Sequence, residues 1–203
     1  AARCCRVVKL HTTTQPPGAL IAALYVDPVG IYSTVPGVEP WGLPGRDART
    51  YAGPWPVVAH PPCQRWGKLG SPRPRGRNRA VSGRPVGADD GCFAAALGAL
   101  RQWGGALEHP AGSFAWRAFG LFEPTGMGWH QGIDGLWCGL VWQSDYGHRA
   151  PKPTWILYKG FTPPPPMLAL RSDPGFRVER MCKAERERSP PAFAELMVSL
   201  ARH

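Results

Sequence analysis

The chain has 203 residues, a formal net charge of +10 and a sequence pI of about 9.8. That length fits one domain with a single buried core, and nine tryptophans argue against a disordered chain although 24 prolines and 25 glycines are present. The positive charge favours a polyanionic partner such as nucleic acid. No long apolar run is present, which argues against a membrane-spanning segment.

The first half of the chain alternates short apolar runs with a helical pattern. Residues 19–27 and 55–59 are predicted to be buried strands, and the turn-rich residues 28–45 between them are predicted to be irregular. Residues 88–105 have a helix signature, because an aspartate can cap the start and two glycines end it. Residues 106–110 then read as a strand that Pro110 ends. A strand, a helix and a strand in this order indicate a parallel crossover.

The second half is predicted to contain two helices and two strands. Residues 113–122 and 189–203 are the helices, residues 135–147 and 154–160 are the strands, and residues 161–188 form a Pro-rich linker. The sequence therefore predicts a single α/β domain with a mostly parallel sheet flanked by helices.

Three residues with reactive side chains, Asp27, Cys63 and Glu108, fall at or just beyond the carboxyl ends of three predicted strands. Ligands of such sheets bind beyond the carboxyl ends of the strands. Cys63 comes directly after two prolines and before a run of arginines, so we expect a lowered pKa and a nucleophilic thiolate. The other cysteines (Cys4, Cys5, Cys92, Cys138, Cys182) form no CxxC pair, which favours reduced thiols in a cytoplasm; Cys92, Cys138 and Cys182 are expected to be inert.

Glu108 is expected to be partly desolvated and to hold or share a proton near neutral pH. A thiolate and a protonatable carboxylate suit attack on a pyrimidine, in which the thiolate adds to carbon 6 and the acid serves ring nitrogen 3. Carbon 5 then becomes nucleophilic. The alternative is a glutamate that caps a loop or pairs with an arginine.

Residues 64–87 form a predicted basic active-site loop without any acid. Its cations are Arg65, Lys68, Arg73, Arg75, Arg77, Arg79 and Arg84. Such a loop is expected to bind phosphates, and Trp66 offers a surface on which an unpaired base can stack. Thiol attack on a base requires a flipped or single-stranded nucleotide. The alternatives are a solvated loop without a partner and a Trp66 that packs under the loop.

Three motifs in order resemble those of DNA cytosine-5 methyltransferases: HPPCQ at 60–64, EHP at 108–110 and DYGHRAPKPTWILY at 145–158. The resemblance implies a Rossmann-like methyltransferase-type fold, S-adenosylmethionine as cofactor, DNA as partner and a bacterial or phage-infected host cytoplasm as location. Cys63 and Glu108 would be catalytic, and Asp27, Asp47 and Pro61 would bind the cofactor. The implied DNA-binding residues are Gln64, Arg65, Trp66, Lys68, Arg73, Arg75, Arg77, Arg79, His109, Arg149 and Lys152.

The chain also departs from that family. Residues 25–32 lack the Phe-x-Gly-x-Gly loop that wraps S-adenosylmethionine, which predicts weak or unusual use of this donor. Related pyrimidine chemistry without it stays open: deamination or one-carbon addition, also on mononucleotides as in thymidylate synthases. A catalytically dead DNA-binding module is a further alternative. His60 and Cys63 could bind zinc only with distant partners, so no metal is expected.

Overall fold

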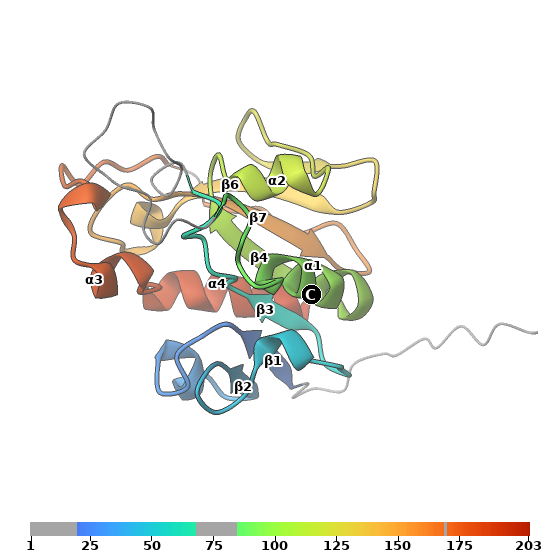
Figure 1. The fold of residues 1–203 in the computed structure, drawn as a ribbon. Coiled ribbons are helices and arrows are strands. Elements are labelled where there is room, and N and C mark those ends of the chain that lie inside the picture. Colours follow the sequence, from blue (N-terminus) through green and yellow to red (C-terminus); the bar gives the residue numbers. More distant parts are fainter. Residues whose placement is uncertain (1–19, 68–84, 169) are drawn as a thin grey trace, which may run out of the picture.

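The computed structural model describes residues 20–67, 85–168 and 170–203. These residues form one domain around a seven-stranded sheet with the order β2-β1-β3-β4-β7-β6-β5 (Figure 1). The strands are β1 (Ile21–Leu24), β2 (Val38–Trp41), β3 (Val57–Ala59), β4 (Gly105–Pro110), β5 (Trp129–Gln131), β6 (Trp137–Trp142) and β7 (Pro153–Lys159). The expected α/β class is confirmed.

The sheet is mixed, so the prediction of a mostly parallel sheet is wrong. Strands β2, β1, β3 and β4 run parallel, whereas β4–β7, β7–β6 and β6–β5 are antiparallel pairs. The reason lies in the connections. The helix α1 (Cys92–Trp103) carries the chain from β3 to β4 as a crossover, but β6 reaches β7 through a short turn that contains the 3-10 helix η3 (Gln143–Tyr146). A short connection can join only antiparallel neighbours.

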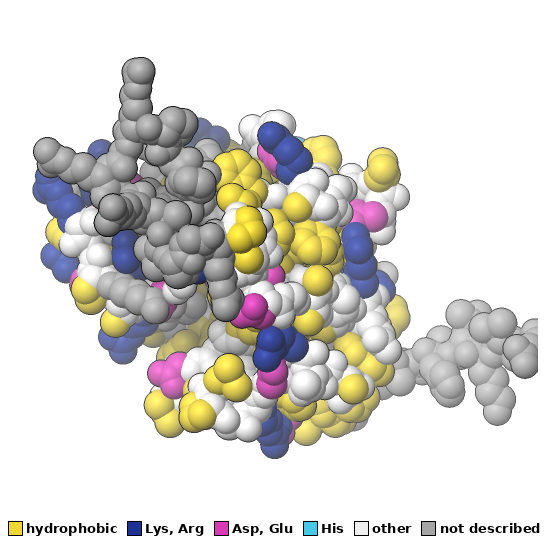
Figure 2. All heavy atoms as spheres, in the orientation of Figure 1, with side chains coloured by type: hydrophobic (Ala, Val, Ile, Leu, Met, Phe, Trp, Pro, Cys, Tyr) yellow, Lys and Arg dark blue, Asp and Glu magenta, His cyan; other side chains and the backbone are white. Residues whose placement is uncertain are grey.

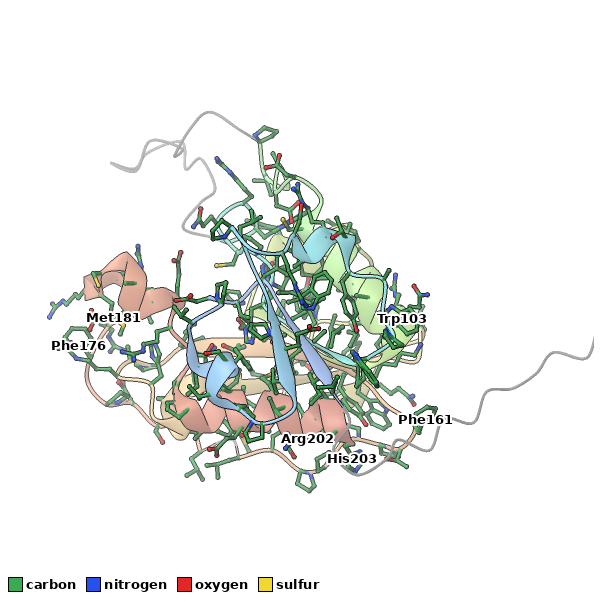
Figure 3. The ribbon with its side chains drawn as sticks, turned by 90° about the horizontal axis from the view of Figure 1, so that it is seen from below. Trp103, Phe161, Phe176, Met181, Arg202 and His203 are labelled. Carbon is green, nitrogen blue, oxygen red and sulfur yellow. The ribbon has the colours of Figure 1, made fainter. Side chains whose placement is uncertain are left out.

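Two long helices cover opposite faces of the sheet, which explains why β1 and β3 are buried throughout. Ala22, Leu24 and Val57 pack in one cluster with α1, while Ile21 and Val58 pack in the other with α4 (Pro191–Arg202). In Figure 3, Trp103 and Phe161 lie on one side of the molecule and Phe176 and Met181 on the opposite side, with Arg202 and His203 at the end of α4. Alternate residues of a strand therefore lie on opposite faces of the sheet, one covered by α1 and the other by α4.

The start of α1 depends on Asp89, as the capping pattern predicts. Its carboxylate accepts hydrogen bonds from the backbone N–H groups of Gly91 and Phe93, at 3.1 and 2.8 Å. The helix ends at Gly104, and the next residue, Gly105, has a φ of 109° where a Cβ would lie 2.0 Å from the Val57 carbonyl oxygen. Only glycine permits this close approach of β4 to β3.

Three elements escaped prediction. Strand β2 lies within the stretch expected to be irregular, and β5 and the short helix α3 (Lys183–Glu187) also form. Both strands lie at sheet edges, where Pro40 of β2 is tolerated because an edge strand has one unpaired side. The helix α2 (Phe114–Ala118) is shorter than predicted, and among the described helices none is long and apolar enough to cross a bilayer.

Candidate functional site

The connections that follow β1 and β3 leave toward opposite sides of the sheet, because β1 leads to β2 on one side and β3 leads to β4 on the other. In open α/β sheets ligands bind at such a switch point. The backbone N–H of His60, the first residue after β3, donates to the carbonyl of Leu24 at the end of β1 at 3.0 Å. The residues that follow β1, β3 and β4 therefore meet at one edge of the sheet.

Cys63 lies at this edge in a tight turn. Its carbonyl accepts hydrogen bonds from the backbone N–H groups of Trp66 and Gly67 at 3.0 and 2.9 Å, and Pro61 before it is buried. The thiol is free and partly buried. Burial and then the charge of Glu108 raise the pKa of Cys63, while Lys152 lowers it. The expected lowering is therefore wrong for the described surroundings, since desolvation and a carboxylate outweigh the cation.

Strand register brings His60 and Glu108 together. Side chains alternate along a strand, so His60 continues the face of Val58, and Glu108 continues the face of Ala106, both toward α4. His60 Nδ1 lies 2.9 Å from Glu108 Oε1, and the two side chains are 11% and 12% exposed. The other imidazole nitrogen, Nε2, lies 2.6 Å from the hydroxyl of Tyr32, which is buried in the 3-10 helix η1 (Ile31–Thr34).

The surroundings of Glu108 and Tyr32 determine which of these two groups is ionised. Desolvation would raise the pKa of Glu108, but the hydrogen bond and charge of His60, with Lys152 and His109, lower it to about 2. Burial and the charge of Glu108 raise the pKa of Tyr32, so its hydroxyl keeps its proton beside Nε2, and Nδ1–H of His60 donates to the Glu108 carboxylate. The expectation that Glu108 carries a proton near neutral pH is therefore wrong for the resting protein.

His109 belongs to the opposite face and does not reach the surface. It is 1% exposed, its Nδ1 lies 2.7 Å from the Ser113 hydroxyl, and its ring stacks on Trp116. Burial lowers the pKa of His109 to about 4, against smaller effects of Glu108 and the carbonyls of Pro62 and Pro61. The predicted DNA contact is wrong, because register turns this side chain into the α1 core, below the proline turn.

Trp66 is also buried, at 7% exposure, and packs against Phe93 and Phe119. Its indole N–H donates to Asp89 Oδ2 at 2.8 Å. Trp66 is thus packed into the core, in line with the alternative to base stacking, and base stacking on it is wrong because its ring packs against Phe93 and Phe119. Of the other predicted loop residues, Lys68, Arg73, Arg75, Arg77 and Arg79 lie outside the described residues, and the Arg65 carbonyl accepts the Gly87 N–H at 3.0 Å.

The remaining predicted DNA-binding residues contact the segment around α3. Gln64 donates to Glu187 at 3.2 Å, Lys152 donates to the Arg186 carbonyl at 3.0 Å, and Arg149 pairs with Glu185 at 3.2 Å. The Arg149 guanidinium also lies 3.9 Å from the centre of the Phe176 ring. In Figure 1, α3 lies beyond the start of α4. This segment thus borders the thiol edge of the sheet.

A cavity of about 480 Å³ lies beside this edge, at the carboxyl ends of β1 and β2. Its lining comprises Tyr25, Val26, Asp27, Pro28, Gly42, Leu43, Asp47, Ala48, Arg49, Pro62, Asp90 and Cys92. Asp27 and Asp47 thus share one cavity, as the resemblance implies, whereas Pro62 and not Pro61 lines it. Figure 2 shows acidic and basic side chains side by side over η2 (Ala48–Thr50) and the start of α1, where Arg49 bonds to the Asp47 carboxylate and the Asp90 carbonyl.

Sequence reasoning missed Tyr32, Tyr25 and the role of His60. Tyr25 directly follows β1 with a φ of 61°, and its hydroxyl is buried without a hydrogen-bond partner among the described residues. The position of His60, one residue beyond a predicted strand beside that of Glu108, was a usable signal. Tyr32 gives none, because its contact with His60 spans 28 residues.

Within the described ranges no group of three or more His, Cys, Asp or Glu side chains could hold a metal ion. Neither the models of known protein families nor the curated proteins give a match to this chain.

Proposed function

We propose that the protein modifies carbon 5 of cytosine in DNA, by methyl transfer, with Cys63 as nucleophile and Glu108 as its proton partner. One observation carries the proposal: a thiol and an ionised carboxylate lie at the carboxyl ends of neighbouring parallel strands, and Pro62, next to the thiol, lines the cavity at the carboxyl ends of β1 and β2. The three sequence motifs support the choice of cytosine.

The resting pair is a thiol and a carboxylate, and this defines the first step. Sγ bonds to carbon 6, the C5–C6 π pair moves to the C4–C5 position, and the C4–N3 π pair takes up a proton at nitrogen 3. The thiol proton passes to Glu108 and then to nitrogen 3, so that the adduct is neutral. Carbon 5 becomes electron-rich and is substituted. Loss of its hydrogen as a proton to solvent then re-forms the C5–C6 double bond and breaks the C6–S bond, and the departing thiolate takes back the proton from nitrogen 3 through Glu108.

The cavity fits S-adenosylmethionine in size and in charge. Pockets for small molecules span about 300–1,000 Å³, and about 480 Å³ is present here. Asp27 is available for a ribose diol or a cationic group, and the buried Tyr25 hydroxyl lacks a partner among the described residues. When bound, this donor would supply an electrophilic methyl group. The Asp47 carboxylate is already bonded to Arg49, which favours modest affinity.

The DNA substrate has to present an unstacked base, because a duplex hides both ring faces. Lys152 is a described cation whose charge acts on both Cys63 and Glu108, which supports it as a phosphate contact in this proposal. The basic loop supplies the other phosphate contacts in this proposal.

The decisive experiment is covalent trapping on DNA that contains 5-fluorocytosine, with S-adenosylmethionine present. Wild type and Cys92→Ser should form a denaturation-resistant complex, whereas Cys63→Ser should not. Mass spectrometry of nucleosides from treated DNA, with and without the donor, identifies the product. 5-Methylcytosine that depends on the donor supports methyl transfer, uracil indicates deamination, and trapping that persists in Cys63→Ser refutes the proposal.

A further inference from the structure

Two buried side chains stand behind Glu108 in a continuous hydrogen-bonded chain: Tyr32 hydroxyl to His60 Nε2 at 2.6 Å, and His60 Nδ1 to Glu108 Oε1 at 2.9 Å. We propose that His60, oriented by Tyr32, is a positioning residue that occupies Oε1 of Glu108 and leaves Oε2 as the one oxygen that exchanges a proton with the thiol and the base. The proton exchange rests on the proposed function; the hold on Glu108 does not.

The ionised carboxylate fixes the proton at one end of this chain, because it can only accept and the facing His60 Nδ1 must therefore carry a hydrogen. At the other end, Nε2 accepts from the Tyr32 hydroxyl in the neutral imidazole and donates to it in the imidazolium. The hydrogen on Nδ1 points at Oε1, since the two strands fix both Cα positions by register. A carboxylate held at one oxygen cannot rotate freely, so its two oxygens have different roles.

The second carboxylate oxygen of Glu108, Oε2, differs from Oε1 in its hydrogen bonding. Glu108 Oε2 is buried and has no hydrogen-bond partner among the described residues. Buried polar atoms are almost always bonded, and an ionised one without a partner is costly. A base whose nitrogen 3 carries a proton and whose carbon 4 carries an amino group provides the missing donors.

Five charged or titratable groups from different elements surround Glu108. His60 follows β3, His109 is its neighbour on β4, Lys152 precedes β7, and Cys63 and Tyr32 complete the surroundings. His109 is turned to the other face of the sheet, and Lys152 donates to the Arg186 carbonyl. His60 is therefore the one described side chain among these that donates directly to the carboxylate.

Carbon-13 NMR of carboxyl-labelled glutamate, assigned with Glu108→Gln, tests the hold on Glu108 without any substrate. In wild type the Glu108 signal should titrate near pH 2. In His60→Leu, desolvation is no longer offset by the hydrogen bond and charge of His60, so the midpoint should move above the ordinary value of 4.5. His60→Gln retains one N–H donor and should give an intermediate midpoint, which keeps the test open if the leucine variant does not fold.

Trapping on 5-fluorocytosine DNA as a function of pH tests the proton exchange. His60→Leu should lose trapping below the new midpoint and recover part of it at higher pH, whereas a purely structural defect would lower the rate equally at every pH. Tyr32→Phe should reduce the rate several-fold without changing the DNA affinity. The control is Tyr158→Phe, which removes another buried hydroxyl that contacts Thr162 and His203 instead.

The outcomes separate the two proposals. A Glu108 midpoint that stays near 2 in folded His60→Leu or His60→Gln overturns the positioning role. Wild type that never traps the base overturns the proposed function and the proton exchange, while a raised midpoint in the same variants still supports the hold on Glu108.

Discussion

Trp66 and Asp89 close the base of the predicted basic loop. The indole N–H of Trp66 donates to Asp89 Oδ2 at 2.8 Å across 23 residues, and the same carboxylate oxygen accepts the Phe93 N–H at the start of α1. The Gly87 N–H bonds to the Arg65 carbonyl beside this contact. The helix cap and the loop base are thus one unit.

Replacement of Trp66 by Phe should lower the free energy of unfolding by about 1–3 kcal/mol, because a part-buried carboxylate oxygen of Asp89 loses the hydrogen bond from its indole donor. Urea denaturation measures the change. Asp90→Asn is the matched control, since Asp90 lies beside the cap with a φ of 56° that asparagine tolerates. Equal losses in both variants would show that the indole bond contributes nothing.

His109 should make stability depend on pH between 6.5 and 4. Its pKa is about 4 in the folded protein against an ordinary 6.5, so the unfolded chain binds a proton first as the pH falls. The contribution is complete above pH 6.5 and is lost as the pH falls toward 4, by up to about 3 kcal/mol. His109→Gln should flatten this slope in denaturation curves. His148, whose pKa burial also lowers, is the comparison, and His148→Gln should flatten the slope less.

The thiol of Cys63 should alkylate slowly at neutral pH. Burial and the charge of Glu108 raise its pKa above the ordinary value of 9.0, so the thiolate fraction is small until the pH exceeds that value. Glu108→Gln removes the charge and should shift the rate profile to lower pH. Mass spectrometry after iodoacetamide treatment measures the rate at Cys63, with the exposed Cys182 as internal reference. An unshifted profile would show that Glu108 does not act on the thiol.

The predicted basic loop should carry most of the salt-dependent DNA affinity. Replacement of Arg73, Arg75, Arg77 and Arg79 by Ala should flatten the dependence of log affinity on log salt, by a slope of roughly 0.7–0.9 for each phosphate that the protein no longer neutralises. Fluorescence anisotropy at several salt concentrations gives the slope. A variant with Arg101 and Arg202 replaced by Ala serves as control. If the slope of this control flattens as much for each arginine replaced, the predicted basic loop is not the DNA-binding surface.

Sequence patterns were sufficient for elements that are long, periodic or capped. The apolar stripe of α1 and Pro191 in the first turn of α4 identified both helices, and the buried runs identified β1 and β3. The same patterns could not predict β2 or β5, since an edge strand of three or four residues has neither a buried run nor a clear alternation. Strand direction also escaped prediction, because it depends on how the chain returns after β4.

For the candidate site, sequence order placed Cys63 and Glu108 at strand ends but could not supply their electrostatics. The raised pKa of Cys63 and the lowered pKa of Glu108 come from groups that tertiary structure brings together, chiefly burial and His60. The burial of His109 had a local signal, because strand alternation assigns it to the face of Leu107, and this signal would have removed it from the predicted DNA surface. The burial of Trp66 had none, since it depends on a contact across 23 residues.

Strand β4 belongs to both halves of the sheet, and this position has a consequence for how the protein folds. On one side it pairs with β7 in the antiparallel half, where β5 and β6, and β6 and β7, are close in sequence; on the other it pairs with β3 across the α1 crossover. Sequence-local hairpins form quickly, whereas parallel pairing has to close a long loop first. The β5–β6 and β6–β7 pairs should therefore form early, whereas both pairings of β4 close long loops, because Glu108 is 48 residues from His60 and equally far from its antiparallel partner Ile156. The contact between His60 and Glu108 should then assemble only after the β6–β7 pair exists, and hydrogen exchange should find both seams of β4 opening more readily than that pair.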